Sequence, residues 1–275
     1  MAKSILITGC STGIGYTCAH ALQKAGYQVI ASCRNADDVK QLQSEGLTCI
    51  QLDLNSSDSI ESAVKKALEL TGGTLDALFN NGAYGQAGAL EDLPTQALRE
   101  QFETNFFGWH HLVKQVLPIM RMQGYGRIVQ NSSVLGFAAM SYRGAYNASK
   151  FAIEGWTDTL RLELANTNIK ISLIEPGPIE TQFRKNAHKA LMKWINFDQS
   201  VHHEEYEKRL KALENQTSTN AFVLPPESCV APLLHALEAK KPRIRYRITI
   251  PTKIFAVLKR LLPSRTLDWV LRRAS

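Results

Sequence analysis

A glycine-rich turn close to the N-terminus constrains the fold of this chain more than any other segment. Gly9, Gly13 and Gly15 follow the apolar residues Ser4–Ile7, and a helix predicted to end near Ala25 follows them. Glycine permits a tight turn and lets backbone N–H groups approach a pyrophosphate at the positive end of a helix. A phosphate loop of the ATPase kind is excluded, because no Gly-Lys-Ser/Thr sequence follows. The turn predicts a dinucleotide site, the alternative being a purely structural strand–helix connection.

Short apolar segments alternate with helical ones along the first 175 residues. Several are continuous apolar runs, which is typical of a parallel sheet covered on both faces. The predicted strands are 4–7, 28–32, 47–52, 75–79, 126–130 and 169–174, and the later predicted helices are 59–70, 98–122 and 146–164. This order predicts one α/β domain over residues 1–275, a single doubly wound parallel sheet with helices on both faces.

The pattern changes beyond residue 180. Residues 180–219 are predicted to form long, polar, weakly amphipathic helix where a ligand-covering lid would leave the sheet, so we expect a helical substrate lid at about 180–224. A helix at 228–239 and a final strand at 243–250 follow. Residues 252–275 mix apolar and basic side chains, and Pro263 divides them into two short helices. They form a predicted basic amphipathic extension.

The net charge of +7 is distributed unevenly. Residues 240–275 contain eleven Lys and Arg against one acid, Asp268, which gives +10 and leaves −3 for the remainder. This indicates a basic surface at the C-terminus, not a nucleic-acid-binding body. The five cysteines form no Cys-x-x-Cys pair and the histidines no His-x-x-x-His pair, so neither a metal nor a disulfide framework is expected. With no signal peptide or apolar run of ~20 residues, we expect a cytoplasmic protein.

A tyrosine and a lysine four residues apart, Tyr146 and Lys150, share one face of a predicted helix. An adjacent ammonium lowers the pKa of a phenol from its usual ~10, so the phenol can exchange protons near neutrality. Ser133 lies at the carboxyl end of a predicted strand, where α/β proteins bind ligands, and its hydroxyl can hydrogen-bond a substrate oxygen. The alternative for the pair is a surface helix with a solvated lysine.

These motifs together resemble the short-chain dehydrogenase/reductase superfamily. Their order and spacing match in Gly9-x-x-x-Gly13-x-Gly15, Asn80-Asn81-Gly82-Ala83, Ser133, Tyr146-x-x-x-Lys150 and Pro176-Gly177. Within it the chain is similar to the branch of 17β-hydroxysteroid dehydrogenases, retinol dehydrogenases and bacterial aldehyde reductases. The resemblance covers residues 1 to about 180 closely. It implies a Rossmann fold that binds NAD(H) or NADP(H), and a homo-oligomer.

The resemblance also implies roles for individual residues. Tyr146 is the general acid in reduction, Lys150 lowers its pKa and holds the nicotinamide ribose, and Ser133 binds the substrate beside Tyr146. Asn105 supports a proton relay through water to Lys150, the alternative being a structural amide inside a helix. The remaining cofactor contacts implied are Gly9, Ser11, Thr12, Gly13, Ile14, Gly15, Asp53, Leu54, Asn81, Gly82, Pro176, Gly177 and Thr181.

The end of the second predicted strand indicates which cofactor is used. An NAD enzyme has a carboxylate there for the ribose 2′-hydroxyl, whereas a 2′-phosphate requires a cation. The sequence at that end is Ala31-Ser-Cys-Arg34, without an acid, and arginine offers a planar fork suited to phosphate. We therefore predict NADP(H), with Arg34 on the 2′-phosphate. The alternative is that Arg34 is a solvated loop residue.

Bulky apolar residues near the predicted site favour a lipophilic substrate. They are Phe137, Met140, Tyr142, Phe183, Leu191, Met192, Trp194, Ile195 and Phe197. The alternative is that they form core. The leading hypothesis is NADPH-dependent reduction of a lipophilic aldehyde or ketone; the others are a hydroxysteroid dehydrogenase or 3-oxoacyl reductase, and a catalytically silent NADP(H) sensor. The extension 252–275 contacts a membrane surface, the substrate pocket or a partner subunit, and these alternatives remain open.

Overall fold

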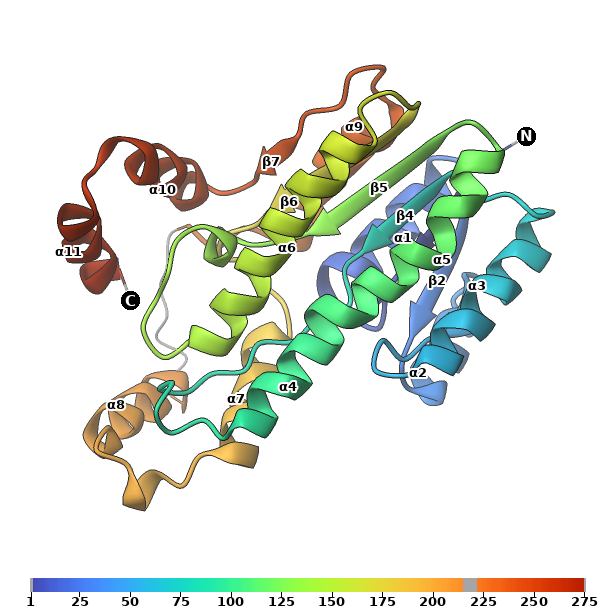
Figure 1. Cartoon of the computed structure of the whole chain (residues 1–275). Coiled ribbons are helices and arrows are strands. Elements are labelled where there is room, and N and C mark those ends of the chain that lie inside the picture. Colours follow the sequence, from blue (N-terminus) through green and yellow to red (C-terminus); the bar gives the residue numbers. More distant parts are fainter. Residues whose placement is uncertain (1, 215–221, 275) are drawn as a thin grey trace.

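A parallel β-sheet forms the centre of the chain (Figure 1). The computed structural model describes residues 2–214 and 222–274, and within them the strand order is β3-β2-β1-β4-β5-β6-β7, with every neighbouring pair parallel. The strands are β1 (Ser4–Ile7), β2 (Gln28–Cys33), β3 (Thr48–Gln51), β4 (Ala77–Asn80), β5 (Gly126–Asn131), β6 (Ile169–Glu175) and β7 (Arg245–Arg247). The predicted doubly wound parallel sheet is confirmed.

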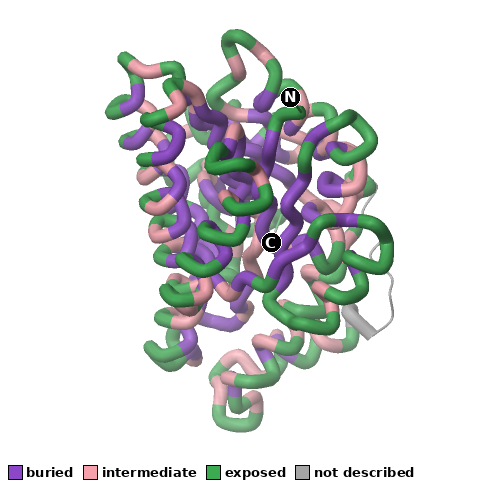
Figure 2. Tube along the Cα trace, turned by 90° about the vertical axis from the view of Figure 1, so that its right-hand side faces the viewer, coloured by how far each residue is buried: buried purple, intermediate pink, exposed green. Residues whose placement is uncertain are grey.

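Helices cover both faces of the sheet, as predicted (Figure 1). One layer consists of α1 (Gly13–Lys24), α2 (Ala36–Ser44) and α9 (Val230–Glu238), and the other of α3 (Ser57–Thr71), α5 (Gly108–Met122) and α6 (Gly144–Glu163). Successive side chains of a strand point to opposite faces. Ile5 and Ile7 accordingly join the core beneath α1, and Leu6 joins the core beneath α3. Two covered faces explain why β1 is apolar at every core position, and Figure 2 shows these buried strands at the centre.

The strand order reverses between β1 and β4. The chain builds β1, β2 and β3 outward in one direction, then returns to place β4 on the other side of β1. At such a switch point the connections leave in opposite directions, and ligands bind at the carboxyl ends of the strands. The loops that follow β1, β4, β5 and β6 therefore meet at one edge of the sheet.

The helix predicted at 98–122 is longer and interrupted. It begins with α4 (Thr95–Phe102), continues through one π-helical turn at Glu103–Phe107, and ends as α5. Gly108 allows this path, because a Cβ there would lie 2.2 Å from the carbonyl oxygen of Leu54. A side chain at this position would force the start of α5 away from the loop after β3.

The segment predicted as long helix at 180–219 is helical in its described part, but it is interrupted. The described part of this segment contains α7 (Phe183–Trp194), a short 3₁₀ turn (Phe197–Gln199) and α8 (His203–Glu214), and residues 215–221 lie outside the described residues. The chain turns back after Trp194 because Ile195, Phe197 and Tyr206 pack their side chains in one cluster with Leu93. A polar helical pattern did not reveal this packing.

Two smaller differences concern the ends of elements, and a third is a helix that was not predicted. The predicted strand 243–250 pairs only over β7, because the chain turns at Thr249 into the next helix. The predicted helix 228–239 starts as a 3₁₀ turn at Pro226–Cys229 before α9. Helix α2 was not predicted, although Asn35 caps it by accepting a 3.0 Å hydrogen bond from the backbone N–H of Asp37. An Asn followed by acids in the first turn is the local signal for such a start.

The C-terminal extension forms two helices, as predicted. They are α10 (Ile250–Leu261) and α11 (Ser264–Ala274), and Pro263 separates them. Thr249 caps α10, which starts two residues earlier than the predicted segment. No helix among the described residues is long and apolar enough to cross a membrane.

Two glycine substitutions test the packing of α5. Gly108→Ala should lower the free energy of unfolding by about 1–3 kcal/mol, because the new methyl group meets the Leu54 carbonyl. Gly155→Ala is the matched control within α6, where a Cβ would have no neighbour within 4 Å; it should raise stability by up to about 1 kcal/mol through helix propensity. Urea unfolding of both variants measures the difference, and equal effects would contradict the close approach.

Candidate active site

The glycine turn and the loop after β4 approach each other backbone to backbone. Gly9 and Gly13 have positive φ angles of 68° and 62°. A Cβ on Gly9 would lie 2.5 Å from the Cα of Gly82, and a Cβ on Gly15 would lie 2.3 Å from the carbonyl oxygen of Gly9. A side chain would be strained by the positive φ angles of Gly9 and Gly13 and would collide with the backbone at Gly9 and Gly15, so this geometry requires glycine at the three positions.

The N-terminus of α1 is suited to bind an anion. Thr12 precedes the helix without a side-chain hydrogen bond to the first turn, whereas Asn35 and Ser56 cap α2 and α3 in this way. The N–H groups of the first turn, beginning at Gly13, therefore have no side-chain cap among the described residues. Ser11, Thr12 and Ile14 belong to the same exposed or half-buried turn. The glycine cradle and the uncapped helix end together fit the pyrophosphate of a dinucleotide.

A chain of hydrogen bonds joins the loops at this edge of the sheet. The Thr8 hydroxyl accepts from the backbone N–H groups of Asn81 (2.9 Å) and Gly82 (2.8 Å). The Asn131 side-chain amide donates to the Asn81 side-chain oxygen at 2.8 Å, and Lys150 Nζ donates to the Asn131 carbonyl at 2.7 Å. Asn131 was not among the predicted site residues; its local signal is a polar side chain at the carboxyl end of a buried strand.

Ser133, Tyr146 and Lys150 are brought together by β5 and α6. Tyr146 and Lys150 are one turn apart on α6, and both are buried. The neighbouring Ser132 does not point the same way, because its hydroxyl donates to Glu154 Oε1 at 2.5 Å. Ser133 instead lies within hydrogen-bonding reach of the Tyr146 hydroxyl and accepts from the Leu135 N–H at 3.1 Å.

Burial controls the charges of this group. It lowers the pKa of Lys150, which is 1% exposed, to about 7, and the nearby Glu154 opposes that change. Burial also raises the pKa of Tyr146 to about 12, against the lowering effects of Ser133 and Arg143. The prediction that Lys150 lowers the pKa of Tyr146 toward neutrality is not met, because the pKa of Tyr146 is raised. The reason is desolvation, which disfavours the phenolate and the ammonium alike.

Asn105 lies in the π-helical turn and is completely buried. Its side-chain nitrogen donates to the Tyr84 carbonyl at 2.9 Å, and its side-chain oxygen accepts from the Tyr84 N–H at 3.2 Å. These contacts are structural ones, as the alternative for Asn105 predicts, and the proton relay that the resemblance implies stays a prediction. In the π turn the Gly108 N–H donates to the Glu103 carbonyl, five residues earlier, in place of the carbonyl four residues earlier that an α-helix would use.

The residues implied for the adenosine end lie beside β2 and β3. Arg34 is exposed immediately after β2, its carbonyl accepts from Gln51 Nε2 at 2.9 Å, and its guanidinium forms no ion pair with any residue in the described ranges. Asp53 accepts from the Asn55 N–H at 3.0 Å, and Leu54 packs beside Gly82.

The loop after β6 reaches the glycine turn. A Cβ on Gly13 would lie 2.8 Å from the Thr181 side chain, and one on Gly177 would lie 2.1 Å from the Thr249 hydroxyl. The carbonyl of Pro176 accepts from the Val134 N–H at 2.7 Å, which joins this loop to the one carrying Ser133. Thr181, Pro176 and Gly177 therefore lie at the same edge as the glycine turn.

Only some of the bulky apolar residues predicted to lie near the site, in the lid and before Tyr146, pack beside Tyr146. The ring centroids of Tyr146 and Phe183 are 5.2 Å apart, and Phe137 and Met140 belong to the same cluster. The inner faces of α10 and α11 complete this cluster through Phe255 and Leu271. The other candidates pack elsewhere: Leu191, Ile195, Trp194, Phe197 and Tyr142 lie in the core of the lid, and Met192 is exposed.

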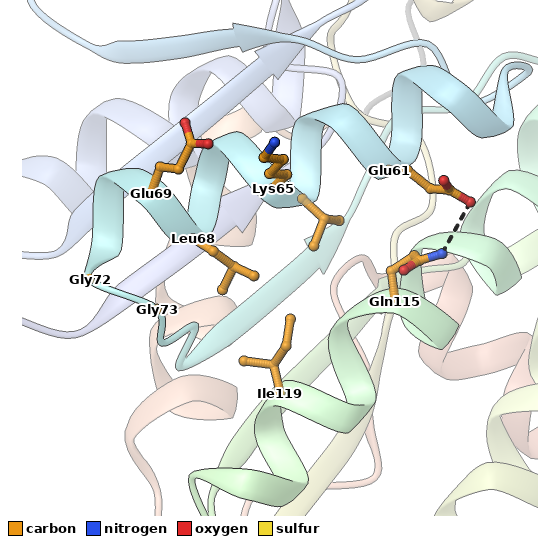
Figure 3. Close-up of a pocket in the computed structure, with 9 residues that line it drawn as sticks. Glu61, Lys65, Leu68, Glu69, Gly72, Gly73, Gln115 and Ile119 are labelled. Atoms are coloured by element: carbon orange, nitrogen blue, oxygen red, sulfur yellow. Dashed lines mark hydrogen bonds between the residues drawn. The ribbon is translucent and has the colours of Figure 1, made fainter.

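A surface hollow of about 590 Å³ lies between α3 and α5, away from these residues (Figure 3). Its lining comes from the facing sides of the two helices and from the turn after α3, and Glu61 accepts a 3.5 Å hydrogen bond from Gln115 across it. None of the residues assigned to the site lines it. Its size alone does not make it the candidate active site.

The fold and the buried Ser–Tyr–Lys group place the chain among the nucleotide-dependent oxidoreductases of the α/β class. A family model described as short chain dehydrogenase matches residues 3–191. The chain belongs to this family.

Named relatives span nearly the whole chain. An uncharacterised oxidoreductase of Escherichia coli, YbbO, is 43% identical over 99% of this chain and 95% of its own. Human retinol dehydrogenase 8 is 34% identical over 94% of this chain and 85% of its own. Among solved structures, a single-residue variant of actinorhodin polyketide ketoreductase with NADPH has a TM-score of 0.73, 27% identity, and coverage of 90% of this chain and 95% of that one. Structures of this fold hold NADP(H) or NAD, so the fold supports a nicotinamide cofactor without selecting one.

The burial of Lys150 predicts a specific pH dependence of stability. Its folded pKa of about 7 lies below the unfolded value of ~10.4, so the folded chain releases the proton first. The cost of the buried charge is complete below pH ~7 and is relieved as the pH rises toward ~10. Lys150→Met removes this cost, so its stability relative to the native chain should be about 3 kcal/mol more favourable near pH 6 than near pH 9. Urea unfolding without cofactor measures this; a difference independent of pH would show that Lys150 titrates normally.

Proposed function

We propose that this chain is an NADP(H)-dependent oxidoreductase that transfers a hydride between the cofactor and a lipophilic carbonyl or alcohol. Reduction of an aldehyde or ketone by NADPH is the favoured direction. The observation that carries the proposal is the position of Tyr146, which lies beside Ser133 on one side and in an apolar cluster on the other. A proton donor in such surroundings suits a carbonyl attached to an apolar substrate.

The chain's own residues supply the proton chemistry. When bound, the nicotinamide supplies or accepts the hydride. Tyr146 donates its proton to the carbonyl oxygen, and Ser133 hydrogen-bonds that oxygen and stabilises the charge that develops on it. Lys150 exchanges protons near neutrality, because burial lowers its pKa to about 7, and it can return a proton to the Tyr146 phenolate. Asn105 holds the loop after β4 against α6 through its contacts with Tyr84 and Ser149.

The preference for NADP(H) rests on Arg34. This exposed guanidinium follows β2 directly and has no ion-pair partner among the described residues, so it is available to a 2′-phosphate. The ketoreductase of similar fold that was solved with NADPH is consistent with this choice.

The substrate class rests on the cluster around Tyr146. Its members Phe137, Met140, Phe183, Phe255 and Leu271 carry no charge. Retinol, in the name of the human relative, is itself a lipophilic alcohol. A hydroxysteroid or a 3-oxoacyl substrate remains the alternative within the same reaction. A silent sensor is disfavoured, because Asn105, Ser133, Tyr146 and Lys150 are all present.

The first experiment is the oxidation of NADPH and of NADH with a panel of substrates, followed at the nicotinamide absorbance. The panel holds medium-chain aldehydes, retinal, steroid ketones and 3-oxoacyl thioesters. Turnover with NADPH and one lipophilic class would support the proposal. NADPH binding without turnover of any member would favour the sensor.

Tyr146→Phe tests the proton donor. Because only the hydroxyl is removed, turnover should fall by about 10²–10⁴-fold while NADPH affinity stays within about twofold. Tyr125→Phe is the matched control, since its hydroxyl bonds the Leu237 carbonyl outside the site, and it should keep full activity. Stopped assays and cofactor fluorescence measure the two quantities. Full activity of Tyr146→Phe would remove Tyr146 from the mechanism.

Arg34→Asp tests the cofactor assignment. The new carboxylate repels a 2′-phosphate and can accept from a 2′-hydroxyl, so the ratio of kcat/KM for NADPH to that for NADH should fall by at least about tenfold. Arg121→Asp, at the exposed end of α5, makes the same charge change away from the site and should leave the ratio unchanged. If both variants keep the native ratio, Arg34 does not select the cofactor.

A further inference from the structure

Helix α10 presents an apolar stripe to solvent. Ile250, Ile254, Val257 and Leu261 are 58%, 49%, 54% and 73% exposed. At 100° per residue they fall within an arc of about 60° on the helix surface. The buried residues Phe255 and Ala256 lie on the opposite side. The stripe is therefore a second apolar face, separate from the one that packs on the chain.

Helix α11 has the same two-sided construction. Leu271 is buried against the chain, whereas Trp269 is 54% exposed on the other side. The guanidinium of Arg273 lies 3.6 Å from the centroid of the Trp269 ring. An exposed tryptophan beside arginine is typical of side chains at a membrane–water interface, where the ring contacts the acyl boundary and the cation contacts headgroups.

The exposed charged side chains of both helices are almost all basic. Between residues 250 and 274 there is one acid, Asp268, and the exposed cations are Lys253, Lys259, Arg260, Arg265, Arg272 and Arg273. Lys253 and Arg260 flank the α10 stripe on one edge. Apolar side chains set among cations fit a surface that offers anionic groups above a hydrocarbon layer.

We propose that α10 and α11 dock on the surface of an anionic lipid bilayer. The α10 stripe and Trp269 enter the acyl boundary, and the cations that flank them, Lys253, Arg260 and Arg273, contact the headgroups. A second copy of this chain is a poorer occupant, because a twofold contact would set this cationic surface against itself. A nucleic acid would leave the apolar stripe without a partner.

The inner side of the two helices gives this docking a consequence for the site. Phe255 and Leu271 belong to the same buried cluster as Tyr146, so the helices that contact the bilayer also cover the apolar side of the active site. Resting on the function proposed above, this places a lipophilic substrate dissolved in the bilayer close to the catalytic tyrosine.

The test is flotation of the full chain with vesicles of phosphatidylcholine alone and of phosphatidylcholine mixed with phosphatidylglycerol. The native chain should float with the mixed vesicles and remain unbound with phosphatidylcholine alone. Binding should weaken as salt is added. Lys253→Ala with Arg260→Ala should lower the partition coefficient roughly thirtyfold, since each cation near such a surface contributes roughly fivefold.

A matched pair of double variants isolates the stripe. Ile254→Glu with Val257→Glu should lower partitioning by at least about tenfold, because two apolar side chains no longer enter the bilayer. The control is Leu70→Glu with Met122→Glu, two exposed apolar residues outside the extension, and it should float like the native chain. Circular dichroism and NADPH binding establish that the variants are folded.

Three results would overturn the proposal. The first is no flotation of the native chain with either vesicle. The second is an equal loss of flotation in the Ile254→Glu/Val257→Glu variant and in the Leu70→Glu/Met122→Glu control. The third is a stripe variant that changes the oligomeric state but not flotation. Flotation is measured without substrate, so it stands or fails independently of the reductase activity. If the native chain turns over no substrate of the panel but still binds vesicles, the proposed function is overturned and the docking proposal is not.

Discussion

The amino group of Lys150 is buried in the interior of the chain, and the neighbouring groups of the site offset the free-energy cost of that burial. Its Nζ donates to the Asn131 carbonyl at 2.7 Å and lies 4.4 Å from the centroid of the Trp109 ring. The Trp109 indole in turn donates to the Gly82 carbonyl at 2.8 Å. The groups that receive the lysine are thus the same groups that order the loops after β4 and β5. A buried charge without such partners would be far more costly.

A second set of charges, two buried carboxylates and two half-buried arginines, attaches the C-terminal region to α6. Arg245 of β7 contacts Glu154 (3.0 Å), one turn beyond Lys150 on α6, and also Glu175 (3.0 Å) at the end of β6. Burial, with the help of Glu154, raises the pKa of Glu175 to about 7 despite Arg245 and Arg247. Removing one partner would leave the other charges without compensation, which is costly. The network therefore holds β7 against α6 and β6, and α10 begins three residues after β7.

The residues before and after position 175 contribute differently to the surroundings of Tyr146. The first 175 residues contain strands β1 to β6 of the sheet and also Ser133, Tyr146 and Lys150. The residues beyond them add Phe183 of α7 and Phe255 and Leu271 of the extension to the apolar cluster around Tyr146.

The sequence alone determined the parallel sheet, the glycine turn and the Tyr146–Lys150 pair, because these follow from local periodicity and from short motifs of fixed spacing. It also predicted the two helices around Pro263. The spacing to Tyr146 also indicated Ser133, and the tertiary structure adds that the neighbouring Ser132 hydroxyl is bonded to Glu154. Tertiary structure decided that Leu191 and Ile195 pack within the lid while Phe183 meets Tyr146. It decided the protonation of Lys150, because desolvation depends on what surrounds a side chain and not on its neighbours in sequence.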